Sequence, residues 1–279
     1  MLKLGEFEVD CIVENRFYLD AGSVYGIVPK TIWSKLQQAD DDNLLPFDIN
    51  VFLVRAHGKN ILLDSGLGDF LLEKQRKLYG CEKPSNLVPA LAALGLSPSD
   101  IDYVVLSHLH WDHAGGCIKK VDGKPKVVFS KARHVIHQEE WEDANHPDER
   151  TVGVYLPDRL RAISDAGLLE LVSENREIMP GVKVVKIGGH TRGQLGVEVE
   201  SEGSKLIYYA DNFLSCHHLK IPYVSAVDLF PLETQRCKRE VLPKIVDGGW
   251  YVAMDHDLEY KVTRVKFDGL KYVCEKVNV

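Results

Sequence analysis

Short apolar runs recur along the chain, and their length and composition predict buried β-strands. The strand-like runs are Val51–Val54, Ile61–Leu63, Tyr103–Leu106, Val127–Phe129, Val135–Ile136, Val182–Ile187, Gly196–Val199, Leu206–Tyr209, Tyr251–Met254 and Val262–Phe267. Helical patterns lie between them at Thr31–Gln38, Phe70–Tyr79, Leu87–Leu94, Asp158–Ala166 and Thr234–Ile245. No repeat or low-complexity tract interrupts these elements. The pattern predicts one layered α/β domain over residues 1–279, with 1–45 as an N-terminal arm or a pocket segment.

Ionisable side chains stand where several of these apolar runs stop. The run that ends at Leu106 leads into Ser107-His108-Leu109-His110-Trp111-Asp112-His113, and later runs lead to His190, Asp211 and His256. A rigid strand that ends at a cleft is how α/β scaffolds present site residues. Taken singly, Asp211 could cap a helix, and His190 or His256 could lie exposed. Together with the dense run that begins at His108, they predict a metal site.

The donor types indicate two divalent cations. His108 and His110 point to the same side of an extended segment because side chains alternate there. The simplest partition gives one metal to His108, His110 and His190 and the other to Asp112, His113 and His256, with Asp211 bridging both. Paired cations about 3.5–4 Å apart are typical of two-metal hydrolases, in which a bridging hydroxide attacks the substrate. Asp112 and Asp211 would then be the catalytic carboxylates. No cysteine falls at a ligand position, so we expect no thiolate site. Imidazole and carboxylate ligands admit zinc, which we favour, and also Mn, Co, Ni and Fe.

The string from His108 to His113 resembles the HxHxDH signature of the metallo-β-lactamase-fold hydrolases. Further similarities are Ile61–Gly66, Gly189-His190-Thr191, Asp211 and His256, which occur in the family's order. The segments Val28–Trp33 and Val227–Thr234 look like the branch that contains N-acyl homoserine lactonases and methyl parathion hydrolase. The resemblance implies a four-layer αββα sandwich with mixed sheets and a dinuclear site at one edge of the sheets.

The resemblance also implies two supporting residues. Asp64 would hydrogen-bond a ligand histidine and fix its orientation, although it could instead cap the turn before Gly66. Thr191 would orient the loop after His190, unless it is an ordinary turn residue. The chain departs from the lactonase pattern at Leu214, where those enzymes commonly carry a carbonyl-polarising tyrosine, and at Gln194, where the family often has histidine.

The favoured function is hydrolysis of a small ester-like bond, with a lactone preferred. Aromatic residues in expected loops, together with His218, suggest substrate contacts at Tyr25, Phe213 and His218, although core packing explains aromatic residues equally well. The alternatives are a phosphotriesterase or aryl esterase of the methyl parathion hydrolase type and a thioester hydrolase like glyoxalase II. A non-hydrolytic alternative is an iron-dependent persulfide dioxygenase.

Composition narrows the range of partners. The chain has 279 residues, 45% of them hydrophobic, and a formal net charge of −7. Its basic clusters are modest, so we expect a small-molecule substrate and no nucleic acid. No apolar run approaches the length of a membrane span and no signal peptide is evident, so no membrane is expected. The six cysteines show no pairing rhythm, which favours reduced thiols and a cytoplasmic location. The segment before Asn43 could serve as the arm of a homodimer.

Overall fold

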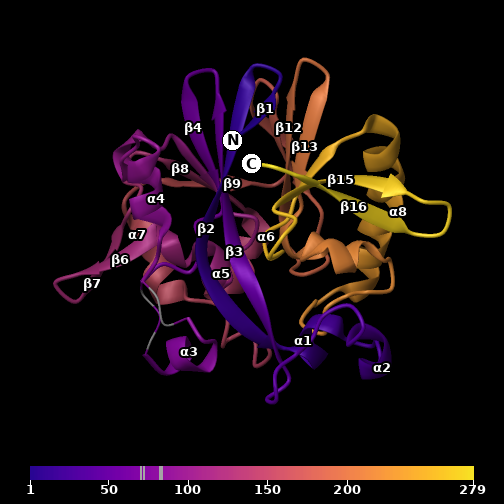
Figure 1. Ribbon diagram of the computed structural model, residues 1–279. Coiled ribbons are helices and arrows are strands. Elements are labelled where there is room, and N and C mark those ends of the chain that lie inside the picture. Colours follow the sequence, from indigo (N-terminus) through magenta and orange to yellow (C-terminus); the bar gives the residue numbers. More distant parts are fainter. Residues whose placement is uncertain (70, 72, 82–83) are drawn as a thin grey trace.

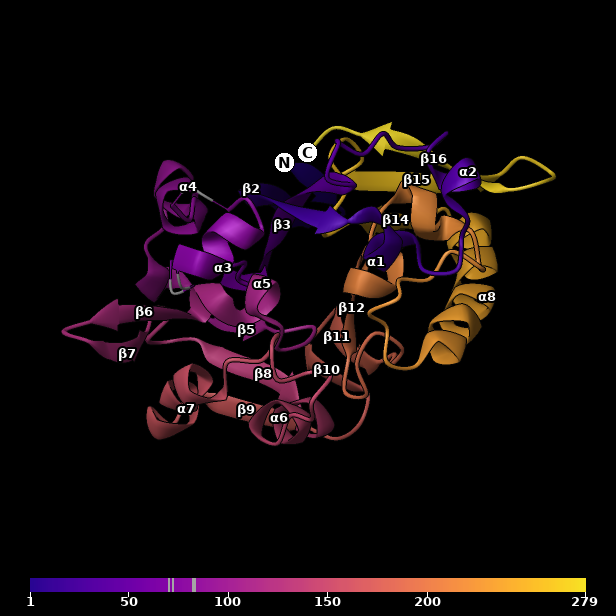
Figure 2. The same ribbon diagram turned by 90° about the horizontal axis from the view of Figure 1, so that it is seen from below.

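The protein consists of two β-sheets packed face to face, with helices on both outer sides (Figure 1). The computed structural model describes residues 1–69, 71, 73–81 and 84–279. Figure 2 shows α8 on one side of the paired sheets and α3, α4 and α7 on the other. The expected αββα arrangement with mixed sheets is confirmed.

The first sheet has seven strands in the order β1-β2-β3-β4-β5-β8-β9. Their bounds are Leu2–Leu4, Phe7–Asp20, Leu44–Ala56, Lys59–Leu63, Tyr103–Val105, Arg133–His137 and Leu169–Val172. Strands β1 to β4 pair antiparallel, whereas β4, β5, β8 and β9 pair parallel. The parallel strands therefore all end at one edge of the sheet, and the loop that leads to His108 leaves β5 at that edge.

The second sheet also has seven strands, in the order β10 to β16. Their bounds are Arg176–Met179, Val182–Lys186, Leu195–Ser201, Ser204–Tyr208, Tyr251–Ala253, Val262–Phe267 and Tyr272–Val277. Strand β11 is antiparallel to β12, and β12 is antiparallel to β13, which is parallel to β14. Strands β11, β13 and β14 therefore run in the same direction, and their carboxyl ends share one edge.

Alternating apolar residues explain the four layers. Those that face inward from both sheets, such as Phe52, Leu63, Val197 and Leu206, form one core between the sheets. The opposite face of the first sheet packs against helices α4 (Leu87–Ala93), α6 (Gln138–Asn145) and α7 (Pro157–Asp165). The opposite face of the second sheet packs against α8 (Pro231–Gly248). Strands such as β4, β5 and β13 are thus buried on both faces, which is why they appear as continuous hydrophobic runs.

Shorter elements connect these layers, and two of them, α5 and η3, carry residues of the site. The helices are α1 (Ala21–Tyr25), α2 (Lys30–Trp33), α3 (Glu73–Leu78) and α5 (Trp111–Ala114). The 3₁₀ helices are η1 (Pro98–Asp100), η2 (Gly115–Cys117), η3 (Ala210–Phe213) and η4 (Cys216–Leu219). Strands β6 (Ile118–Val121) and β7 (Lys124–Val127) form a separate hairpin.

Several expected elements differ from those in the structure. The helix expected at Thr31–Gln38 is only the single turn of α2, and the strand expected at Val127–Phe129 is the end of the β6–β7 hairpin. The helix expected from Phe70 begins at Glu73, and Phe70 lies outside the described residues.

Two of the cysteines expected to be free are joined. Cys216 in η4 and Cys274 in β16 form a disulfide, so the prediction of unpaired cysteines is wrong for this pair. The sequence separation of 58 residues conceals the pairing, because only the fold brings η4 beside β16. Within the described residues, no helix is long and apolar enough to cross a membrane.

Candidate metal centre

The predicted metal ligands come from both sheets and meet at one edge. Strand β5 leads to His108 and His110, and α5 directly follows with Asp112 and His113. In the second sheet, the loop after β11 carries His190, η3 carries Asp211 after β13, and His256 follows β14. Because the carboxyl ends of these strands face the same edge, ligands separated by more than a hundred residues become neighbours.

Two glycines shape the turn that carries His190. Gly188 and Gly189 have φ angles of +60° and +100°, which side-chain-bearing residues rarely adopt. A Cβ atom on Gly189 would lie 2.5 Å from Thr234 Oγ1 and 2.9 Å from Asn212 Oδ1. Glycine is therefore required for the close approach that brings His190 to the centre.

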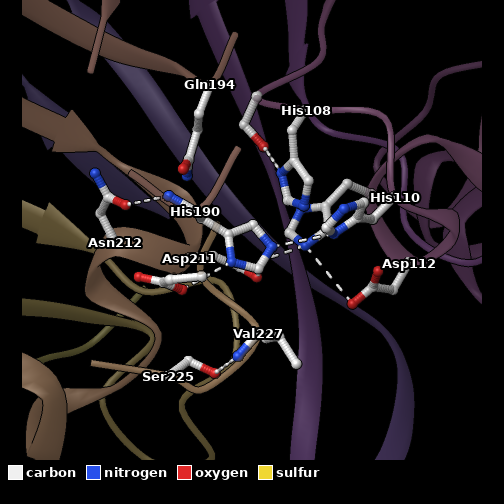
Figure 3. A network of polar contacts seen from close by, with 12 residues as sticks. His108, His110, Asp112, His190, Gln194, Asp211, Asn212, Ser225 and Val227 are labelled. Carbon is white, nitrogen blue, oxygen red and sulfur yellow. Dashed lines mark hydrogen bonds and ion pairs between the residues drawn. The ribbon is translucent and has the colours of Figure 1, made fainter. Parts of the chain in front are cut away.

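The side chains form two adjacent donor groups. The first donor group is His108, His110 and His190, and the second is His113, Asp211, Asp255 and His256. Figure 3 shows His108, His110 and His190 of the first group close to Asp211. Within each group, the atoms that could bind a metal lie within 4.8 Å of one another. Asp112 is just outside the second group, with its Oδ2 3.6 Å from the Nε2 atoms of both His113 and His256. The structure thus brings all seven predicted ligands together.

Asp211 lies between the two donor groups. Its Oδ2 is 3.0 Å from His190 Nε2 in the first group. Its Oδ1 is 3.3 Å from His113 Nε2 and 3.4 Å from His256 Nε2 in the second. One carboxylate oxygen therefore faces each group, which is the geometry that a bridging ligand needs.

The donor atoms fit a pair of cations. His190 Nε2 lies 3.0 Å from His110 Nδ1, and His113 Nε2 lies 3.3 Å from His256 Nε2. In the described part of the chain, His108 Nε2 is buried without a hydrogen-bond partner. Buried polar atoms are normally paired, and neutral imidazole nitrogens are favoured ligands of divalent transition metals. Nitrogen atoms that converge in this way, with His108 Nε2 lacking a hydrogen-bond partner, therefore fit a pair of bound cations.

Supporting contacts aim the histidine rings. His113 Nδ1 is 2.8 Å from Asp64 Oδ2, His190 Nδ1 is 3.0 Å from Asp228 Oδ1, and His256 Nδ1 is 2.9 Å from the Asp48 carbonyl oxygen. Each contact engages the nitrogen that faces away from the centre, so Nε2 remains available to a metal. Partners of this kind fix both the tautomer and the orientation of a ligating imidazole.

Asp64 is the most heavily engaged of these partners. Besides contacting His113, it accepts hydrogen bonds from the Ser107 backbone N–H at 2.6 Å, the Ser107 hydroxyl at 2.7 Å and the Tyr208 hydroxyl at 2.5 Å. Its φ of +59° is unusual for a residue other than glycine. Asp64 therefore links β4, the loop after β5 and β13, and holds His113 from the position that the resemblance implied.

Sequence reasoning missed Asp228 and Asp255. Asp228 binds both His190 and the Thr234 hydroxyl. Its segment, Val227–Thr234, was noted only for its resemblance to the lactonase branch, and nothing in it indicates that Asp228 contacts a histidine. Asp255 directly precedes His256 at the end of β14, so the strand-end signal that identified His256 could also have identified it. Both Asp255 carboxylate oxygens are buried without a hydrogen-bond partner among the described residues. Its Oδ2 lies 3.6 Å from His256 Nε2.

The electrostatics of the centre reflect densely packed charges. Burial, followed by neighbouring histidines, lowers the pKa values of His108 and His110 well below the usual histidine value. Burial also raises the pKa of Asp255 well above its usual range, and the charge of Asp211 adds to the rise. For Asp211 the effect of burial is outweighed by His190 and His113, which hold its pKa well below the usual range. The carboxylates around this centre would therefore be stabilised by added positive charge.

A mostly apolar cavity of about 130 Å³ adjoins both donor groups. Its apolar walls include Phe17, Leu19, Tyr79, Trp111, Val154, Leu214 and Val227. On its polar side lie His110, Asp112, His190, Asp211 and His256. A reacting group in this cavity would contact the metal-binding side chains while its apolar part faced the aromatic walls.

The structure does not place the three expected substrate contacts in this cavity. Tyr25 is fully buried and stacks on Trp33 and His218, at ring-centre distances of 5.4 and 5.2 Å. Both ring nitrogens of His218 are engaged, with the Ser215 hydroxyl and the Val24 carbonyl oxygen. Phe213 packs in the core beneath α8. For Tyr25 and Phe213 this is the packing alternative noted from sequence, whereas His218, for which an exposed position was the alternative, is buried. His217 instead lines a second cavity of about 370 Å³ that shares His256.

Comparisons with known proteins agree with this geometry. An N-acyl homoserine lactonase, AiiB, from Agrobacterium fabrum is 29% identical over 72% of this chain and 71% of its own length. A solved structure described as a probable metal-dependent hydrolase from Staphylococcus aureus has a TM-score of 0.91 and 29% identity, with all of both chains covered. AidC, described as a dizinc quorum-quenching lactonase in complex with a product, has a TM-score of 0.80 at 23% identity, covering 100% of this chain and 97% of its own.

The family model of the metallo-beta-lactamase superfamily matches residues 44–258. This span is most of the chain and includes every residue of both donor groups. The relatives and structural neighbours described above are named as lactonases or hydrolases. The chain therefore belongs to the metallo-beta-lactamase superfamily.

Proposed function

We propose that this protein is a dinuclear metal-dependent hydrolase that opens a small, uncharged lactone. The observation that carries the proposal is the position of Asp211, whose two carboxylate oxygens face separate donor groups. An arrangement of this kind suits two neighbouring cations that act on one bond. The lactonase names of the relatives support the substrate class.

The residues that would hold the metals follow from the two donor groups. His108, His110 and His190 would bind one ion, His113, His256 and Asp112 the other, and Asp211 would bind both. Asp255 is a further candidate ligand, because it lies within the second donor group. When bound, the two ions would activate a water molecule as the nucleophile and polarise the substrate carbonyl. Histidine and carboxylate donors suit zinc, and the dizinc neighbour AidC supports that choice.

Asp112 is the carboxylate best placed to move a proton. It lines the cavity, and its side chain keeps 13% of its surface exposed, whereas Asp64 keeps 3%. The oxygen of Asp112 that does not bind the metal could take the proton released by the attacking water and return it to the leaving alkoxide. Positioned acid–base groups of this kind typically contribute about 10²–10⁴-fold to the rate.

The cavity supports a small and mainly apolar substrate. Its volume of about 130 Å³ is below the range of roughly 300–1,000 Å³ that is common for drug-sized ligands. Phe17, Tyr79 and Trp111 would contact the apolar part of the substrate and exclude water. Leu214, where lactonases commonly carry tyrosine, also lines this cavity. No hydroxyl from that position would then assist at the carbonyl.

The function is tested by metal analysis combined with a substrate panel. We expect about two metal ions per chain in protein purified with zinc, and faster turnover of lactones than of aryl esters, thioesters or phosphotriesters. Asp211→Asn should reduce both metal content and turnover, whereas Asp247→Asn, at an exposed position late in α8, should change neither. Metal-loaded protein that hydrolyses none of these compounds would refute the proposal.

Asp112 gives a more specific prediction. Because its carboxylate would carry the proton during turnover, Asp112→Asn should lower kcat by about 10²–10⁴-fold. Single-turnover and steady-state kinetics on metal-saturated protein would measure the loss, with Asp247→Asn as the control. A kcat within about threefold of the unaltered protein would assign the proton transfer to another group.

A further inference from the structure

Glu140 is a fully buried carboxylate that belongs to neither donor group. It lies in the first turn of α6 and has no exposed surface. Glutamate is almost never fully buried unless it is paired with other polar groups. Its partners therefore indicate what the residue is for.

The first two partners of Glu140 fix the loop after β5. Its Oε1 accepts a hydrogen bond of 2.9 Å from the backbone N–H of Leu109, the residue between His108 and His110. The same oxygen accepts a hydrogen bond of 3.1 Å from the Tyr155 hydroxyl. Tyr155 in turn forms a backbone bridge with His110, and the two ring centres lie 5.1 Å apart. Glu140 thus holds His110 through its backbone and through a ring that packs on it.

The other chain segment of the first donor group also lies against Glu140, where Glu140 Oε2 and Thr191 Oγ1 are both buried without a hydrogen-bond partner in the described part of the chain. Burial raises the pKa of the Glu140 carboxyl, and the Thr191 hydroxyl is foremost among the groups that oppose the rise. Thr191 is fully buried and directly follows His190. A Cβ atom on Gly193 would lie 2.2 Å from the Glu140 backbone nitrogen, so this loop packs directly against α6.

These contacts reach one donor group and not the other. Glu140 binds Leu109, between His108 and His110, and packs against Gly193 in the loop after His190. By contrast, His113 is held by Asp64, and His256 by the Asp48 carbonyl oxygen. We propose that Glu140 is a positioning residue that joins the two chain segments of the first donor group and thereby sets metal affinity at that site alone. The inference rests on the proposed dinuclear function and deepens it.

The test measures stepwise metal affinity rather than activity alone. Zn²⁺ would be titrated against a chromophoric chelator for the unaltered protein, Glu140→Leu, Glu140→Gln and a control, Glu139→Gln. Glu139 neighbours Glu140 on α6, but its side chain pairs with Lys186 on β11. Loss of a supporting partner typically weakens metal binding about 10–100-fold. We expect Glu140→Leu to raise one of the two zinc dissociation constants by that factor. The other dissociation constant should change by less than about twofold.

Two further readouts separate positioning from general stability. Glu140→Gln keeps a carbonyl oxygen that can accept from Leu109 and Tyr155, so it should recover most of the lost affinity. In Co²⁺-substituted protein, the visible absorption of one of the two ions should change in Glu140→Leu. Tyr155→Phe removes only the hydroxyl that donates to Glu140, so it should weaken binding of the same ion to a smaller extent. This variant supplies the test if Glu140→Leu does not fold.

Several outcomes would overturn the inference. An equal loss of affinity for both ions would show that Glu140 supports the fold generally. Unchanged affinities would show that Glu140 does not position the metal ligands. If the unaltered protein binds one ion at most, the dinuclear function fails separately. The positioning role then stands only if Glu140→Leu weakens that single ion, and it falls if the affinity is unchanged.

Discussion

At the scale of single residues, Glu14 is a second buried carboxylate that holds a loop near the centre. Its oxygens accept hydrogen bonds of 3.2 Å from the backbone N–H groups of Leu67 and Gly68. A Cβ atom on Gly66 would lie 2.6 Å from Glu14, so the loop packs closely around the side chain. The same loop begins at Asp64, which holds His113. Burial raises the pKa of Glu14 to about 7, against 4.5 for a free glutamate.

This raised pKa predicts a pH dependence of stability. The folded protein binds the Glu14 proton more tightly than the unfolded chain does, so this contribution is fully present below pH 4.5 and is lost as pH rises through about 7. The shift corresponds to about 3 kcal/mol. The free energy of unfolding, measured in urea from pH 4.5 to 8, should therefore fall less with pH in Glu14→Gln than in the unaltered protein. Glu6→Gln, at an exposed position, is the control, and parallel curves for Glu14→Gln and the unaltered protein would contradict the assignment.

Residues could be predicted where local sequence carries their signal. His108 to His113 stand out because several donors fall within one short run, and His190, Asp211 and His256 stand out because each follows a strand. Glu140 and Asp228 could not be found in this way. Their partners, Leu109 and His190, come from distant segments, so only the packing of α6 and of the loop before α8 shows what they do.

At the scale of elements, the disulfide ties the last strand to the loop beside the centre. Cys216 begins η4, which follows the helix that carries Asp211, and Cys274 lies in β16. The backbone N–H of Cys216 also donates a hydrogen bond of 2.9 Å to Asp257, the neighbour of His256. The disulfide therefore anchors a segment that borders both Asp211 and His256.

Removal of this disulfide should destabilise the protein measurably. The disulfide closes a loop of 58 residues. In the chain-entropy description, the lost entropy of the unfolded chain raises the free energy of unfolding by about 4 kcal/mol. Cys274→Ser should lose up to this amount in urea unfolding, and the unaltered protein should lose a similar amount when a reductant is added. Cys237→Ser, which removes an unpaired thiol on α8, should retain the response to reductant. An unaltered protein that does not respond to reductant would disprove a stabilising disulfide.

Helices and strands could be predicted where their hydrophobic pattern is clear. Strands such as β4 and β13 were found because they end in continuous buried apolar runs. Strand β2 was missed because Glu14 and Asn15 interrupt its apolar positions near a shift in register with β3. The buried Glu14 that obscured this strand is itself the residue that holds the loop after Asp64.

At the scale of the whole molecule, the centre joins the two sheets at one edge. His108, His110, Asp112 and His113 follow a strand of the first sheet, whereas His190, Asp211 and His256 follow strands of the second. The two sheets otherwise meet through a core of apolar side chains and through hydrogen bonds such as the one from Tyr208 to Asp64. Metal ions would therefore add cross-links between the two halves of the molecule.

Metal binding should for this reason raise the stability of the whole domain. An ion that binds only the folded state, at a free concentration of 100 times its Kd, adds about 2.7 kcal/mol to the free energy of unfolding. That corresponds to several degrees in Tm for a chain of this size. Removal of metal with a chelator should lower Tm accordingly, and added zinc should restore it in proportion to the logarithm of its concentration. Asp211→Asn, which removes a contact to both donor groups, should respond much less, whereas Asp247→Asn should respond like the unaltered protein. A Tm that is the same with and without metal would mean that the ligands do not close on a cation, because a ligand that binds the folded state must stabilise it.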